Sequence, residues 1–204
     1  AAIEGLRNEG IFTPPSLQGT LVIPSNVGGA HWGGVAIDPV REIAVVPVNR
    51  LAAVVQLIPR EGFDLAKTRA AEQRLGDDYE YNMMRGTPYI MRRRMLLAPS
   101  KMPCTPPPFG ALVAVSLKTG GRLWEVPLGT TEDLTPVGIA LRTGTPNFGG
   151  PVATAGGVVF IGAAMDRYLR AFDAESGAEL WRGRLPAAGM ATPEPRSGPA
   201  APGE

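Results

Sequence analysis

Two stretches of the chain repeat each other: LVAVSLKTGGRLW at residues 112–124 and LRAFDAESGAELW at residues 169–181. Each stretch predicts a strand, a polar turn containing a glycine (Gly120 or Gly177), and a second strand that begins with Leu-Trp. Between the two copies, residues 149–161 (GGPVATAGGVVFI) predict two further strands around an Ala-Gly-Gly turn. The second copy therefore completes a unit of four short antiparallel strands.

Each unit carries a tryptophan at the same place, Trp124 in the first copy and Trp181 in the second. Four strands with an aromatic residue at a fixed position are typical of a blade of a β-propeller. One blade has two bare faces, so several must pack side by side to bury a core. We therefore expect an all-β partial propeller of about three four-stranded blades, in which both tryptophans pack between blades.

The composition supports a turn-rich β protein. Among 204 residues there are 26 Gly and 21 Pro, which disfavours a helical bundle, while 44% hydrophobic residues are enough to fill a core. The formal net charge of +1 gives no electrostatic signature of nucleic-acid binding. No apolar run reaches the ~20 residues that a membrane-spanning helix needs.

The remaining segments differ in character. Residues 61–94 are rich in charge and predict an insertion with a short helix at 66–75, followed by a proline-rich loop at 95–109. Residues 194–204 predict a disordered tail, so the blades would occupy 1–193. Outside the repeat, strands are expected at 20–23, 35–37, 43–48 and 51–58.

No general catalytic motif is present, and candidate site residues are few. His31 and Trp32 lie among four glycines at 28–34, where the backbone can approach another group closely. His31 is interpreted as a plain loop side chain next to a tryptophan. Asn49 ends an apolar strand, where an amide is costly to bury without partners and can bind a planar polar ligand or form a turn. Cys104 has no nearby histidine in the sequence and is interpreted as a packed loop thiol. The arginine run 92–94 is interpreted as a solvated face, with a contact to anionic lipid or to another segment as the alternative.

Several phrases together resemble the membrane-bound quinoprotein dehydrogenases of the glucose/quinate/shikimate type, which use pyrroloquinoline quinone (PQQ). The resemblance runs in order from about residue 9 to residue 193, over the C-terminal part of that family. It is carried by residues 9–22 (EGIFTPPSLQGTLV), 31–39 (HWGGVAIDP), 102–110 (MPCTPPPFG), 149–172 (GGPVATAGGVVFIGAAMDRYLRAF) and 183–193 (GRLPAAGMATP).

The resemblance implies an eight-bladed propeller that oxidises a sugar or cyclic polyol such as glucose, quinate or shikimate, and passes the electrons to ubiquinone. It places the protein at the periplasmic face of the bacterial inner membrane. It also implies that the catalytic aspartate, the ligands of the divalent cation (Ca²⁺ or Mg²⁺) and the membrane anchor lie upstream of this segment. The isolated segment is therefore expected to be inactive.

Three cofactor-binding residues follow from the resemblance. Asn49 falls where the family has an asparagine that hydrogen-bonds PQQ, Phe148 falls near a tryptophan of related alcohol dehydrogenases, and Trp32 lies in a loop lining the same funnel. No catalytic or metal-binding residue is expected here. The family continues past residue 193 with a glycine-rich, histidine-containing segment, which a proline-rich tail replaces here. The competing hypothesis is a non-catalytic scaffold with PQQ-type repeats, like outer-membrane assembly lipoproteins.

Overall fold

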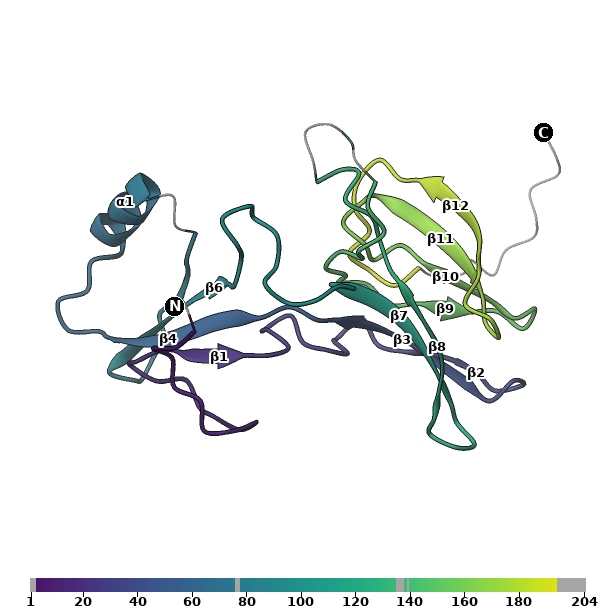
Figure 1. The fold of residues 1–204 in the computed structure, drawn as a ribbon, viewed down its shortest axis with the longest axis horizontal. Helices are drawn as coiled ribbons and strands as arrows, with labels where there is room; N and C mark the ends of the chain where they lie inside the picture. The colour runs from purple at the N-terminus through teal and green to yellow at the C-terminus, as the bar shows by residue number, and fades with distance from the viewer. Residues whose placement is uncertain (1–2, 76–77, 135–137, 139, 194–204) are drawn as a thin grey trace. The chain divides into compact units, whose positions relative to one another are not determined.

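The computed structural model describes residues 3–75, 78–134, 138 and 140–193. It contains one helix and three four-stranded antiparallel sheets within this part of the chain, which confirms the predicted all-β fold (Figure 1). The predicted disordered tail at 194–204 lies outside the described residues. The chain divides into two compact units, residues 1–28 with 50–106 and residues 29–49 with 107–204.

The sheet nearest the C-terminus is built from four consecutive strands, as the repeat predicts. Its strands are β9 (Val152–Ala153), β10 (Val158–Ile161), β11 (Tyr168–Asp173) and β12 (Glu179–Arg184), in that spatial order. They form one meander, yellow-green in Figure 1. Glycine at position 177 has φ +72°, a value that an L side chain rarely adopts, and it closes the turn between β11 and β12.

The second sheet of this unit has the order β2-β3-β7-β8. Its strands are β2 (Ala36–Asp38), β3 (Ile43–Asn49), β7 (Gly110–Ser116) and β8 (Arg122–Pro127). The two repeat copies are structurally equivalent. Ala114 pairs with Trp124 in one sheet and Ala171 pairs with Trp181 in the other, with a shift of register directly after each of these pairs.

These two sheets pack face to face over one apolar core. Strand β3 alternates buried and half-buried residues along its whole length, which is the pattern of a strand with one face in a core. The core consists of Ile43, Val45, Leu112, Ala114, Leu128, Val159, Ile161, Ala163, Ala164, Phe172 and Ala174.

Trp124 ties the two sheets together, which confirms its predicted place between blades. Its indole N–H donates to the carbonyl of Ala174 at 3.0 Å, and its ring lies so close to Gly177 that a Cβ there would be 2.6 Å from Cδ2. Trp181 is 52% exposed, so packing between blades stays a prediction for that residue.

The first unit holds the third sheet, in the order β1-β4-β6-β5, and the helix. Its elements are β1 (Thr20–Val22), β4 (Ala53–Pro59), α1 (Leu65–Leu75), β5 (Glu80–Asn82) and β6 (Tyr89–Met95). Helix α1 begins where Asp64 accepts a hydrogen bond from the N–H of Lys67 through its side chain (3.0 Å), a normal N-cap.

This third sheet differs from a blade made of consecutive strands, because the chain leaves the second sheet after β3 and returns to it at β7. The helix predicted in 61–94 is present, but the same segment also supplies strands β5 and β6. The arginine run is part of β6. Arg93 pairs with Glu80, and Arg92 and Arg94 lie over the ring of Tyr79, so these side chains are not simply solvated.

No helix among the described residues is long and apolar enough to span a membrane.

Candidate functional site

The three predicted cofactor-binding residues lie in the same unit and converge on one pair of loops. Trp32 lies in the loop before β2, Phe148 lies in the loop before β9, and Asn49 is the last residue of β3. Strands β2 and β9 are the first strands of the two packed sheets, and they contact each other. The two loops are therefore equivalent parts of neighbouring sheets.

Asn49 is buried (1% exposed) and its side chain binds the backbone of Asn147. Its Nδ2 donates to the Asn147 carbonyl and its Oδ1 accepts from the Asn147 N–H, both at 2.9 Å. The side-chain amide of Asn49 thus gives the backbone of Asn147 the two hydrogen bonds that a neighbouring strand would otherwise provide. The same bonds satisfy the buried amide of Asn49 itself, so its burial is compensated. A direct hydrogen bond from Asn49 to a cofactor stays a prediction.

His31 joins the two loops through its ring nitrogens. The N–H of Gly33 donates to its Nδ1 (3.0 Å), and its Nε2 lies 2.8 Å from Oδ1 of Asn147. The contact joins residues that are far apart in the chain. The interpretation of His31 as a plain loop side chain is therefore incomplete.

Trp32 and Phe148 form an aromatic pair, with ring centroids 6.1 Å apart and planes inclined by 29°. Trp32 is 73% exposed, so one face of the indole lies against Phe148 while much of the ring remains open to solvent. Such a surface suits a flat aromatic ligand, because aromatic rings prefer offset stacking.

Glycines let the loops pack backbone against backbone. A Cβ on Gly33 would lie 2.6 Å from the carbonyl carbon of Gly149, and one on Gly150 would lie 1.8 Å from the oxygen of Gly33. The hydroxyl of Thr192 donates to that same oxygen at 3.2 Å, which brings the segment after β12 to the site. A side chain at either position would force the two loop backbones apart, because the nearest atoms belong to the backbone.

Sequence reasoning missed Asn147, although a signal was present. His31-Trp-Gly-Gly in one loop and Asn147-Phe-Gly-Gly in the other share the order polar, aromatic, glycine, glycine. The structure pairs His31 with Asn147 and Trp32 with Phe148, and it packs Gly33 against both Gly149 and Gly150. Aligning the two loops by this order would have identified the contact.

A buried ion pair fixes the segment that follows β8. Arg170 (2% exposed) donates through both terminal nitrogens to the carboxylate of Asp166 (0% exposed), and the N–H and hydroxyl of Thr130 donate to Asp166 Oδ2 at 2.7 and 3.1 Å. Nearby, hydrogen bonds from Arg167, with a further contribution from Arg184, lower the pKa of Asp133 to about 2. These charges attach the loop to the last sheet.

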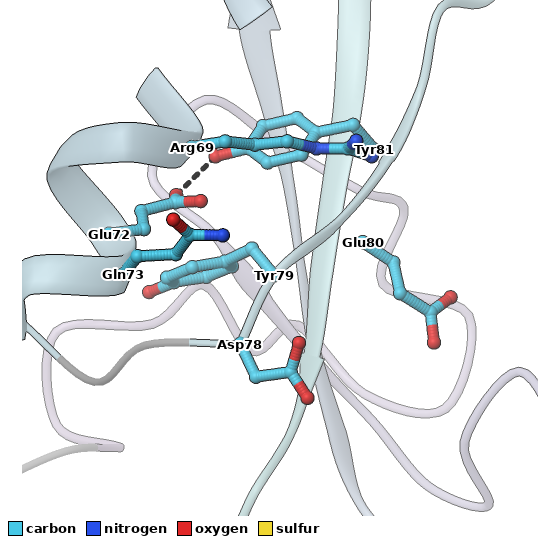
Figure 2. Close-up of a pocket in the computed structure, with 7 residues that line it drawn as sticks. All are labelled: Arg69, Glu72, Gln73, Asp78, Tyr79, Glu80 and Tyr81. Carbon is cyan, nitrogen blue, oxygen red and sulfur yellow. Dashed lines mark hydrogen bonds between the residues drawn. The ribbon is translucent and has the colours of Figure 1, made fainter. Parts of the chain in front are cut away.

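A cavity of about 510 Å³ lies in the other unit between α1 and β5. Figure 2 shows the Tyr81 hydroxyl donating to Glu72 across its wall. Burial, and then this hydrogen bond, raise the pKa of Tyr81 to about 12, so the phenol stays protonated and the pair forms a fixed wall. The other lining residues are Arg69, Gln73, Asp78, Tyr79 and Glu80.

In the described part of the chain, no group of three or more His, Cys, Asp or Glu side chains lies close enough together to hold a metal ion.

Comparison with protein families gives a match over residues 1–195 to the PQQ family, described as the β-propeller domain of glucose, ethanol and alcohol dehydrogenases. The quinoprotein glucose dehydrogenase of Escherichia coli is 42% identical over 192 residues, covering 92% of this chain and 24% of the relative. The quinate/shikimate dehydrogenase (quinone) of Acinetobacter baylyi is 37% identical over 194 residues, covering 93% and 24%. The chain thus spans about a quarter of the length of these relatives.

Solved structures share the fold at low sequence identity. A europium-containing methanol dehydrogenase superposes with a TM-score of 0.53 at 22% identity, covering 85% of this chain and 24% of that one. A quinohemoprotein alcohol dehydrogenase from Comamonas testosteroni gives a TM-score of 0.53 at 18% identity, covering 86% and 21%.

Proposed function

Because the chain belongs to the PQQ-dependent dehydrogenase family, we propose that it is a segment of an enzyme that oxidises a hydroxyl group of a sugar or cyclic polyol. The observation that carries this proposal is the similarity, along nearly the whole chain, to dehydrogenases named for glucose and for quinate and shikimate. We extend the proposal to ubiquinone as the electron acceptor and to the periplasmic face of the inner membrane as the location.

Within this segment we assign Trp32 and Phe148 to the wall of the PQQ site. The open face of Trp32 offers a flat surface on which an aromatic ring can stack. Asn49 supports that wall from inside by holding the backbone of Asn147. When bound, PQQ supplies the acceptor for the two electrons taken from the alcohol, while the protein binds and orients it.

We assign neither the catalytic base nor the ligands of the divalent cation to this segment. The 204-residue chain alone is therefore expected to reduce no dye with glucose, quinate or shikimate in the presence of PQQ and Ca²⁺. Turnover by this chain alone would show that the assignment is wrong.

The proposal is tested on the complete protein that contains these residues, loaded with PQQ and Ca²⁺ and supplied with each of the three substrates. We expect dye reduction that depends on PQQ, and reduction of a ubiquinone analogue in membranes that carry the protein. Absence of activity with every sugar and polyol tried would refute the proposed function.

A matched pair of variants tests the assigned wall. Trp32→Ala should weaken PQQ binding by about five- to tenfold, because one aromatic stacking contact is lost. Phe12→Ala removes another exposed aromatic ring, 90% exposed in a separate loop, and should leave PQQ binding unchanged. Equal effects of the two substitutions would remove Trp32 from the site.

A further inference from the structure

The His31 ring can adopt only one arrangement of its proton in this loop. Its Nδ1 accepts the N–H of Gly33, so in the neutral ring the proton lies on Nε2. That nitrogen then donates to Oδ1 of Asn147, 2.8 Å away. The hydrogen bond within the loop therefore determines the donor that reaches across to the neighbouring loop.

Asn147 independently requires the same arrangement. Its Nδ2 donates to the carbonyl of Val48 at 3.2 Å, which orients the side-chain amide so that Oδ1 faces His31. Its backbone N–H and carbonyl are both bound by Asn49, and the residue is 0% exposed. Asn147 therefore cannot rotate to meet a different partner, and an oxygen acceptor always faces the histidine.

The position of the Trp32 ring depends on the two hydrogen bonds of His31 more than the positions of the neighbouring residues do. It is largely exposed, so burial contributes little to holding its ring in place. The ring stacks on Phe148 and meets His31 in an edge arrangement, with the His31 centroid 5.5 Å away and the planes at 61°. The residues before and after it, His31 and Gly33, are both fixed through the imidazole.

We propose that His31 is a positioning residue which, as the neutral Nε2–H tautomer bound to Asn147, holds Trp32 stacked against Phe148. The value of this placement for cofactor binding rests on the proposed function. The placement itself is a property of the chain without any ligand.

Two substitutions separate the two hydrogen bonds of the ring. In His31→Asn, an amide oxygen takes the place of Nδ1 and can still accept from Gly33, but the side chain is too short to reach Asn147. In His31→Gln, an amide N–H takes the place of Nε2 and can still donate to Asn147, but the acceptor for Gly33 is lost. If the link to Asn147 positions Trp32, glutamine preserves the stack and asparagine does not.

The test uses the ¹⁵N-labelled 204-residue chain, in which His31 is the sole histidine. Long-range ¹H–¹⁵N spectra of the imidazole should show the Nε2–H tautomer, and nuclear Overhauser contacts should join the rings of Trp32 and Phe148. The Nδ1–H tautomer, or an averaged mixture of both, would overturn the proposal without any variant being made. We expect the contacts between the rings to persist in His31→Gln and to vanish in His31→Asn, and their persistence in both would also overturn it.

Titration with PQQ separates this inference from the proposed function. In the complete protein, we expect PQQ binding to weaken about fivefold in His31→Asn, because one hydrogen bond is lost, and less than twofold in His31→Gln. If the tautomer and the ring contacts are as expected but PQQ does not bind the complete protein, the positioning role stands and the proposed function fails. If PQQ binds but the ring contacts are insensitive to His31, the proposed function stands and the positioning role fails.

Discussion

Trp124 and Trp181 occupy equivalent positions of the repeat, and their different surroundings allow a matched test of how the sheets are held together. Trp124→Phe removes the indole N–H that donates to Ala174 across the two sheets. A hydrogen bond of this kind contributes about 1 kcal/mol to the free energy of unfolding. Trp181→Phe changes a side chain that is 52% exposed, where substitutions usually stay within about 0.5 kcal/mol.

Truncation to alanine should increase the difference in the free energy of unfolding between variants at Trp124 and at Trp181. Trp124→Ala also removes the ring that covers Gly177 and packs against the core, and full burial of such a ring is worth about 3–5 kcal/mol on truncation to alanine. Because Trp124 is only partly buried, we expect about 2–3 kcal/mol. The same change at Trp181 should again have a small effect.

Urea unfolding of the four variants, followed by far-ultraviolet circular dichroism, measures these differences without depending on tryptophan fluorescence. With a slope of about 2 kcal/mol per molar urea, the midpoint should fall by roughly 0.5 M for Trp124→Phe and by more than 1 M for Trp124→Ala. Losses of equal size at Trp124 and Trp181 would refute the inference that the first tryptophan joins the sheets.

Three further predictions concern charged and titratable groups. The pKa of Asp133 is lowered to about 2, so its carboxylate contributes fully to stability above about pH 4, the pKa in the unfolded chain, and this contribution is lost as the pH falls to 2. In acid unfolding, Asp133→Asn should therefore lack the loss of stability between about pH 4 and 2. Arg170→Met leaves the buried carboxylate of Asp166 without its ion-pair partner and should cost about 3–5 kcal/mol in urea unfolding, whereas loss below 1 kcal/mol would contradict the buried pair. The phenolate absorbance step of Tyr81 should be centred near pH 12 and should vanish in Tyr81→Phe. A Tyr81 step near the ordinary tyrosine value of about 10 would argue against burial and the Glu72 contact.

Much of the fold follows from local signals in the sequence. The repeat identified the four strands of the last sheet and the place of Trp124, because alternating strands and a glycine turn are encoded within a dozen neighbouring residues. Helix α1 was also predicted, since residues 66–75 are good helix formers, whereas the cap by Asp64 is seen only in the structure.

Strands β5 and β6 were not predicted, because the contacts that stabilise them join distant residues. The arginines of β6 would be unusual in an isolated strand, but Arg93 meets Glu80 and Arg92 meets Gln56 on the neighbouring strands. Cross-strand pairs of this type stabilise a sheet without producing an apolar alternation in the sequence. A reading by hydrophobic period alone therefore assigns such a segment to a loop.

The sequence predicted three residues of the candidate site but not the hydrogen bonds that connect them. Trp32 and Asn49 were indicated by their local surroundings and by family resemblance, and Phe148 by resemblance alone. Asn147, which joins them, forms its bonds with partners about a hundred positions away. Side-chain hydrogen bonds between loops produce no periodic pattern in the sequence. They become visible only when equivalent positions of two blades are compared.

The chain leaves the second sheet after β3 and returns to it at β7, and this affects which segments can change in length. Asn49 and Gly110 are paired partners on adjacent strands, yet sixty positions separate them in the chain. Because the exit and the re-entry are neighbours, the connection can change in length without displacing either strand, as long as β4 keeps its pairing with β1. This junction is therefore a site for protein engineering, where a different module can be grafted onto residues 1–28 and 50–106 while the ends of β3 and β7 stay paired.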